Sequence, residues 1–303
     1  MSNIKLFSIS QAVNELVPQL VLLEKDLQNL IEKNMESFFG VRFLKSEYAI
    51  TNGRMDSIGI DENNCPVIFE YKRNSNENVI NQGLFYLDWL LDHKAEFHLL
   101  VAKILGNHIA DSIDWTMPCV YCIANSFTKY DLHAVNQMQR NIKLIQYQKY
   151  GEDLILFNHL NAPTCKNHSI VRDKPQQSPK NTREPSTRSL HLRVDSIPDD
   201  IKKIFINLCD FIESLGDDIT KAELKWYLAY KKARNIFCIE VFDNRILVYL
   251  NINPELLTLE SGFSRDMRGI KHNGTGDVRL VLKNDQDFQK AMPFLQKTYY
   301  FSY

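Results

Sequence analysis

Asp56, Glu70 and Lys72 are the residues of this sequence whose types and spacing could do chemistry together. Asp56 lies in residues 54–60 and Glu70 in residues 66–71, two runs whose composition predicts neighbouring strands. Glu70 and Lys72 are two positions apart on a strand and therefore share a face. Asp56 and Glu70 are 14 residues apart, which fits a strand, a turn and a strand. Antiparallel pairing can therefore bring Asp56 beside the other two.

Two carboxylates on one face of a sheet are costly unless something binds them. A divalent cation resolves this conflict, because Mg²⁺ prefers oxygen ligands from carboxylates, waters and a substrate phosphate. Such an ion lowers the pKa of a bound water, and Lys72 can orient that water and offset charge in the transition state. The spacing alone is weakly specific, and an exposed hairpin edge with solvated charges is the alternative. Glu70 favours the site because it interrupts the apolar run 67–69.

The elements that must position these residues are a helix, three strands, a second helix and a fourth strand. The amphipathic run 22–39 predicts the first helix, which Gly40 ends. Residues 51–53 predict a hairpin turn. The further elements expected in this block are a strand over 41–50, a helix over 78–93, a strand over 119–124, a helix over 130–140 and a closing hairpin over 142–149 and 153–159.

These residues resemble the PD-(D/E)XK nuclease superfamily, and most closely the branch of NucS-type endonucleases, over about residues 20–125. The resemblance rests on Ser46-Glu47-Tyr48, Gly53-Arg54-Met55-Asp56, Val67-Ile68-Phe69-Glu70-Tyr71-Lys72-Arg73, Gln82 and Tyr86-Leu87. Met55 stands where the superfamily motif has Pro, a departure that is common in the superfamily. The resemblance implies an α/β fold, a restriction-endonuclease-like mixed sheet flanked by helices. It also implies Mg²⁺ or Mn²⁺ as cofactor and DNA as partner.

The resemblance also assigns roles to individual residues. Asp56, Glu70 and the main-chain carbonyl of Tyr71 are expected to bind the metal ion, and Lys72 to assist the attacking water. The family motif QxxxY matches Gln82 and Tyr86, one helical turn apart, and Gln82 is expected near the attacking water or the scissile phosphate. The residues expected to contact substrate in this domain are Arg54, Arg73 and Tyr86.

The first helix of the family often carries a further metal-binding glutamate. Glu24 fits this role best because it shares a face with Leu27, while Glu32 and Glu36 are second choices. A plain surface carboxylate remains an alternative for all three. Glu47 is expected to be either a metal ligand or the partner of Arg54.

The domain organisation follows from one change in composition. Residues 161–198 are rich in Pro, Ser, Thr, Asn and Gln and have no apolar period, which predicts a flexible linker. Seven basic and three acidic residues between 161 and 195 make it basic. Either a solvated tether or a weak contact with a polyanion fits this charge. We therefore expect a nuclease-like domain over 1–160 and a smaller α+β domain over 199–303.

The C-terminal domain resembles an uncharacterised domain that follows the nuclease in bacterial proteins. Its loop 262–277 combines Arg265, Lys271 and Gly-Thr-Gly, which could hold a phosphate with main-chain N–H groups and two cations. Arg265 and Lys271 are therefore candidate substrate-binding residues, and a structured turn with an Arg265–Asp266 ion pair is the alternative. Residues 225–234 predict a basic, aromatic helix-to-strand segment that could stack on bases, or a helix end with snorkelling lysines.

Composition limits the remaining possibilities. The 36 basic and 37 acidic residues give a net charge of −1, which excludes a strongly basic chain but not a local basic groove. No run approaches the roughly 20 apolar residues of a membrane span, and we expect a cytoplasmic protein. Cys119 and Cys122 lie in an apolar strand and are expected to be buried core thiols rather than zinc ligands.

Three functions fit these observations. The leading prediction is a metal-dependent DNA endonuclease that hydrolyses phosphodiester bonds, in bacterial DNA repair, restriction or phage defence by analogy. Two sites in a homodimer would suit cutting of both strands, although nothing in the sequence shows a dimer. The alternatives are a catalytically inactive nucleic-acid-binding or regulatory module on the same fold, and a sensor whose C-terminal loop binds an anionic ligand.

Overall fold

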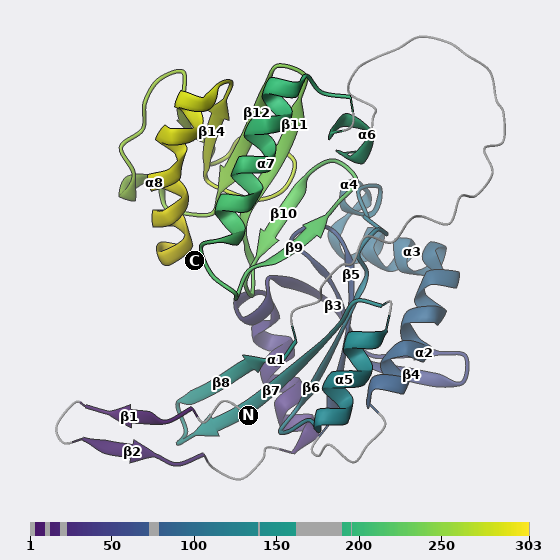
Figure 1. Cartoon of the computed structure of the whole chain (residues 1–303). Helices are drawn as coiled ribbons and strands as arrows, with labels where there is room; N and C mark the ends of the chain where they lie inside the picture. Colours follow the sequence, from purple (N-terminus) through teal and green to yellow (C-terminus); the bar gives the residue numbers. More distant parts are fainter. Residues whose placement is uncertain are drawn as a thin grey trace, which may run out of the picture. The chain divides into compact units, whose positions relative to one another are not determined.

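The computed structural model describes residues 4–9, 13–18, 23–72, 79–138, 140–161, 190–194 and 196–302. The chain divides into two compact units, Met1–Pro163 and Thr164–Tyr303 (Figure 1). Most of the expected linker, residues 162–189 and 195, lies outside the described residues. Among the described helices, none is both long and apolar enough to cross a membrane.

The first unit is built on a six-stranded mixed sheet with the order β3-β4-β5-β6-β7-β8 (Figure 1). The strands β3, β4 and β5 are antiparallel neighbours, β5, β6 and β7 are parallel, and β8 is antiparallel to β7. The six strands are β3 (Val41–Ile50), β4 (Gly53–Asp61), β5 (Pro66–Lys72), β6 (Cys119–Ala124), β7 (Ile142–Tyr150) and β8 (Leu154–His159). This sheet confirms the expected mixed α/β fold class.

Helices cover both faces of this sheet. On one face, α1 buries Leu27, Ile31 and other apolar residues against Phe69 and Tyr71 of β5. On the other face, residues of α2, α3 and α5 pack against Ile68 of β5. The helices of this unit are α1 (Glu24–Phe39), α2 (Val79–Asp92), α3 (Lys94–Leu105), α4 (Asn107–Ala110) and α5 (Lys129–Gln137). Successive residues of β5 therefore face different helices.

Backbone conformation and close packing explain three positions in this unit. The helix α1 ends at Gly40, whose φ of 63° is left-handed and favours glycine. In the hairpin between β3 and β4, Asn52 takes a φ of 63°, which Asn tolerates better than most residues. Gly59 in β4 allows close packing, because an added Cβ would lie 2.6 Å from a methyl group of Val41.

The second unit has an antiparallel six-stranded sheet with the order β13-β14-β12-β11-β10-β9. Its core is formed between one face of the sheet and the helices α7 and α8. The elements of this unit are α6 (Leu190–Val194), α7 (Asp199–Glu213), β9 (Thr220–Glu223), β10 (Leu228–Lys231), β11 (Asn235–Phe242), β12 (Arg245–Leu250), a 3₁₀ turn (Pro254–Leu256), β13 (Ser264–Asp266), β14 (Val278–Leu282) and α8 (Asp285–Phe301). A second, separate sheet domain is thus present, as expected.

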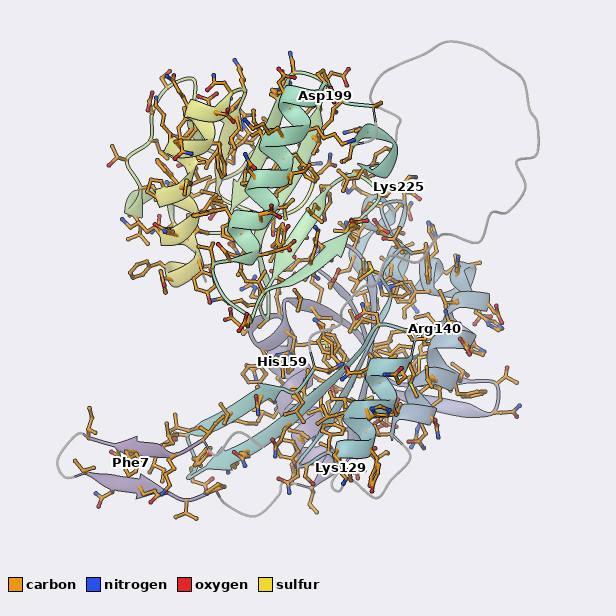
Figure 2. The ribbon with its side chains drawn as sticks, in the orientation of Figure 1. Phe7, Lys129, Arg140, His159, Asp199 and Lys225 are labelled. Atoms are coloured by element: carbon orange, nitrogen blue, oxygen red, sulfur yellow. The ribbon has the colours of Figure 1, made fainter. Side chains whose placement is uncertain are left out.

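Some elements differ from the sequence prediction. A hairpin of β1 (Leu6–Ser8) and β2 (Asn14–Leu16) precedes α1, and Phe7 on it is 45% exposed (Figure 2). The segment 225–234 forms the strand β10 and its flanking turns instead of a helix end, and both Tyr227 and Tyr230 are buried. The prediction that these two rings could stack on bases is therefore wrong. Cys119 and Cys122 are buried, as expected.

Candidate active site

The candidate site lies where β4 and β5 separate. Their ladder ends at the pair Ser57–Phe69, so that Asp56 and Glu70 are the next residues on the two strands. The Asp56 carboxylate accepts the main-chain N–H of Tyr71 at 2.9 Å. In return, the Glu70 carboxylate accepts the main-chain N–H of Asp56 at 3.3 Å. The structure therefore brings the two carboxylates together, each fixed by the backbone of the opposite strand.

Electrostatics make this pair costly in the absence of a cation. Glu70 is only 2% exposed, and burial followed by the charge of Asp56 raises the pKa of Glu70 to about 9. Burial also raises the pKa of Asp56, although the Tyr71 N–H and the charge of Lys72 oppose the rise. Lys72 thus lies close enough to act on both carboxylates. Strongly shifted carboxyl groups with a charged neighbour are typical of functional sites.

A polar network on α1 holds the Asp56 backbone from the other face of the sheet. The amide of Gln28 donates to the main-chain carbonyl of Asp56 at 2.8 Å and to Glu32 at 2.9 Å. Glu32 also accepts the Ser57 hydroxyl at 2.6 Å, and Ser57 in turn accepts the Tyr71 hydroxyl at 3.1 Å. Gln28 and Ser57 are both buried. The position next to Asp56 is therefore anchored to α1.

Sequence reasoning missed Gln28 and Ser57. Glu32 was a second choice for a metal ligand, whereas the structure places it among these hydrogen bonds. The signal was present, because Glu24, Gln28 and Glu32 recur every four residues and form a polar stripe on α1. Glu24 lies at the start of this stripe, and its charge contributes to the raised pKa of Asp56. Whether Glu24 joins the metal site stays a prediction, because it forms no group of three acidic side chains with Asp56 and Glu70 among the described residues.

Glu47 is the partner of Arg54, one of the two roles expected for it. Its carboxylate lies 2.7 Å from Nε of Arg54 and 3.2 Å from Nζ of Lys25. Burial acts to raise the pKa of Glu47, but hydrogen bonds from Lys25 and Gln28 and the charge of Arg54 outweigh it and lower the pKa. Glu47 has a φ of 50°, unusual for a residue with a side chain and frequent at functional sites.

The expected Gln82 and Tyr86 lie on α2, beside the hairpin of β3 and β4. Tyr86 is buried, and an added Cβ at Gly53 would lie 2.8 Å from its ring. Burial and then the charge of Glu70 raise the pKa of Tyr86, which places its hydroxyl near the carboxylates. Gln82 is exposed one turn earlier. Arg73, an expected substrate contact, lies outside the described residues.

The donor set fits a hard divalent cation. Asp56 and Glu70 present two carboxylates, and burial, together with their mutual repulsion at Glu70, raises the pKa of both despite the charge of Lys72. No group of three or more His, Cys, Asp or Glu side chains converges as a metal centre in the part of the chain that the structure describes. Mg²⁺, however, commonly takes one or two carboxylates and completes its shell with water and substrate phosphate. The main-chain carbonyl of Tyr71 is a third protein ligand available by sequence position.

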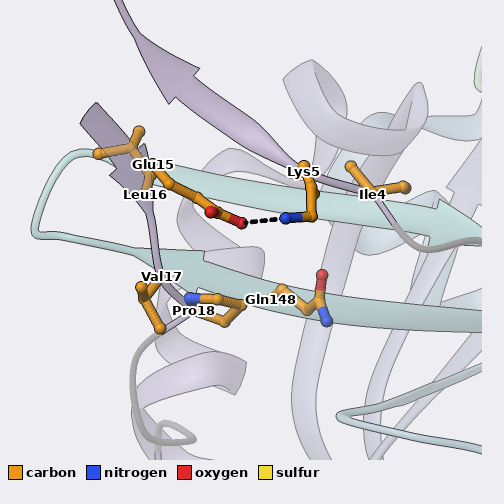
Figure 3. Close-up of a pocket in the computed structure, with 7 residues that line it drawn as sticks. All are labelled: Ile4, Lys5, Glu15, Leu16, Val17, Pro18 and Gln148. Carbon is orange, nitrogen blue, oxygen red and sulfur yellow. Dashed lines mark ion pairs between the residues drawn. The ribbon is translucent and has the colours of Figure 1, made fainter. Parts of the chain in front are cut away.

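The chain has two further candidate features, a pocket in the first unit and two basic residues of the second unit. A pocket of about 230 Å³ lies under the β1–β2 hairpin beside Gln148, and its two charged residues, Lys5 and Glu15, pair with each other at 3.1 Å (Figure 3). The candidates Arg265 and Lys271 belong to the second unit and are exposed. The ion pair between Arg265 and Asp266, given above as the alternative, is not formed, because Asp266 pairs with Arg268 at 2.8 Å.

Each of the two units contains a segment that matches a different family model. Residues 23–114 match the family model described as the endonuclease NucS C-terminal domain. Residues 194–302 match a domain of unknown function, DUF5655. The expected resemblance to the NucS-type branch, with an uncharacterised domain after it, is thereby confirmed.

Individual relatives extend these matches. A Haemophilus influenzae protein described as uncharacterized is 26% identical over 288 residues, covering 94% of this chain and 95% of its own length. Among solved structures, an EndoMS–dsDNA complex is 20% identical with a TM-score of 0.29, and it covers 42% of this chain and 47% of its own. A repair endonuclease from Pyrococcus abyssi is 17% identical with a TM-score of 0.28, covering 43% and 50%. The chain spans about half the length of these two structures.

Proposed function

We propose that the first unit hydrolyses phosphodiester bonds of DNA in a reaction that depends on Mg²⁺ or Mn²⁺. The observation that supports this most directly is the pair of buried carboxylates, Asp56 and Glu70, beside Lys72 within the segment that matches a NucS-type endonuclease domain. A purely structural pair of this kind would be expensive, because each carboxylate is desolvated next to a like charge. A site that receives a cation and a phosphate removes this cost.

Each residue of the site has a separate role in this proposal. Asp56, Glu70 and the Tyr71 carbonyl would hold the cation, and the charge of Glu24, at the start of α1, acts on Asp56 as well. When bound, the ion supplies charge neutralisation and eases deprotonation of the attacking water. The Lys72 ammonium orients that water and offsets charge that develops on the phosphate.

Substrate contacts surround these groups. Tyr86 lies near the carboxylates. Arg54 is largely exposed, and its ion pair with Glu47 orients its side chain. We propose that both contact the DNA backbone, with Gln82 on the exposed side of α2. Arginine suits this role because its fork of donors matches phosphate oxygens.

Cleavage of labelled DNA tests this proposal. The substrates are single-stranded, duplex, flap and mismatched DNAs, each incubated with Mg²⁺, Mn²⁺ or EDTA. Wild-type protein should cut at least one of them only with metal, and Asp56→Ala and Lys72→Ala should not cut. If no substrate is cut while all three proteins bind DNA equally, the chain is instead a nucleic-acid-binding module on the same fold.

A further inference from the structure

The second unit carries an arginine pair on the face of its sheet that α7 and α8 leave uncovered. Register places Cys238, Tyr249, Arg279 and Arg265 in one row across β11, β12, β14 and β13. Residues that pair directly across strands share a face. The adjacent residues along these strands, such as Leu280, pack into the core with the helices. The two arginines therefore lie side by side on the opposite face.

The charge of these two arginines is poorly balanced. Like charges directly opposite on neighbouring strands are destabilising. Asp266 alternates to the other face of β13 and pairs with Arg268. The carboxylate of Glu240 accepts hydrogen bonds from Tyr249, at 3.0 Å, and from Asn273. Within the described part of the chain, no carboxylate makes an ion pair with Arg265 or Arg279.

A buried donor of Arg279 has no acceptor. Its Nε atom is inaccessible to solvent and makes no hydrogen bond to any residue that the structure describes. Arg279 lies beside the Tyr249 hydroxyl, where it opposes the rise in the Tyr249 pKa that burial and Glu240 cause. Buried donors in folded proteins are almost always paired with protein, water or a ligand. A guanidinium group with an unpaired Nε, beside a second guanidinium group, therefore indicates a missing anion.

The loop between β13 and β14 brings the His272 side chain to this face. The His272 ring stacks on Tyr249 with 4.3 Å between ring centroids, and its Nε2 atom is buried and unpaired among the described residues. Glycine holds the loop close, because an added Cβ at Gly276 would lie 2.9 Å from the backbone of Leu250. Because Nδ1 lies 2.9 Å from the carbonyl of Ile270 and donates to it, Nε2 can donate to an anion only when the ring is protonated. The two arginines are therefore the groups to test.

We propose that Arg265 and Arg279 form a phosphate-binding site on this face of the second unit. A phosphate dianion matches two adjacent guanidinium groups in charge, and its oxygens can accept from both forks, whereas a carboxylate balances only one. The phosphate could belong to a free compound such as a nucleotide or to a DNA backbone. This site goes beyond the proposed nuclease activity and does not depend on it.

Binding of three probes to the full chain in EDTA tests the proposal without any DNA cleavage. The probes are labelled orthophosphate, labelled AMP and a labelled short duplex. Arg265→Gln and Arg279→Gln are compared with Arg245→Gln, a matched loss of charge on the same face of the sheet, four residues along β12 from Tyr249. Each of the first two variants should weaken binding at least about tenfold. Arg245→Gln should stay within about twofold of wild type.

The outcomes separate the sources of the phosphate. Weaker binding of orthophosphate and AMP by the two variants supports a site for free phosphate compounds. If only duplex binding weakens, with a smaller salt dependence than in Arg245→Gln, the site holds a DNA backbone. If Arg265→Gln and Arg279→Gln bind all probes as Arg245→Gln does, or if wild type binds none, the proposal is wrong. Circular dichroism checks folding, and the exposed Arg265 keeps the test valid if Arg279→Gln does not fold.

Discussion

Glu70→Gln should stabilise the metal-free first unit at neutral pH while it abolishes DNA cleavage. Glu70 has a pKa of about 9 in the folded protein, against an ordinary value of 4.5. At pH 7 the unfolded chain releases a proton that the folded protein keeps, which lowers the free energy of unfolding by on the order of 3 kcal/mol. Glutamine carries no such penalty, and its carbonyl can still accept the main-chain N–H of Asp56.

The sign of the effect follows from the direction of the pKa shift. The penalty is absent below the ordinary pKa of 4.5 and grows as the pH rises toward 9. Urea unfolding in EDTA at pH 5 and pH 8 measures it, with Trp226→Phe in every protein so that Trp89 and Trp115 report on the first unit. The stability gained by Glu70→Gln over wild type should be small at pH 5 and large at pH 8.

A neighbouring carboxylate provides the control for this experiment. The pKa of Glu47 is lowered, so its charge adds stability above its ordinary pKa, and Glu47→Gln should lose less than about 1 kcal/mol at pH 8 because the group is partly exposed. A Glu70→Gln protein that is less stable than wild type at pH 8 would contradict the raised pKa of Glu70. A difference in stability that does not change with pH would contradict it as well.

Three further predictions concern the hydrogen bonds and packing around the site and the binding of a metal ion to it. Glu32→Ala should destabilise the first unit by about 1–3 kcal/mol, because it leaves the buried Ser57 hydroxyl without its acceptor and removes one acceptor of the Gln28 amide, and urea unfolding measures this loss. Gly59→Ala should cost about 1–3 kcal/mol in the same assay, because its Cβ would collide with β3; equal stability would contradict this packing. Mn²⁺ should raise the melting temperature of wild type but not of Asp56→Asn, and an equal rise in both would place the metal elsewhere.

The strands of the candidate site could be predicted because their patterning and turns agree. The apolar run before Glu70, the turn that includes Asn52 and the glycine after α1 all indicate the same hairpin and helix. Local sequence therefore placed Asp56 and Glu70 on adjacent strands. Their reciprocal hydrogen bonds could not be predicted, because they depend on where the β4–β5 ladder ends, which the whole sheet determines.

Longer-range features were harder to predict for the same reason. Gln28 is buried by packing against a strand that follows it in the chain, so its own helix gives only a weak signal. The neighbours Arg265 and Asp266 suggested an ion pair, but residues next to each other on a strand point to opposite faces. The strands β13 and β14 are joined by a loop with no regular pattern, and the arginine row became visible only from their register.

The carboxylate pair and Lys72 are the groups that we propose to cut DNA. Single-turnover cleavage of a substrate that wild type cuts tests this most directly, with DNA affinity measured on the same proteins. Lys72→Met should lower the cleavage rate by at least about 100-fold and leave affinity within about threefold. Lys45→Met, a matched change on β3, should cut like wild type. Cleavage by Lys72→Met at the wild-type rate would contradict the role of Lys72, and undiminished cleavage in EDTA would contradict the need for a metal ion.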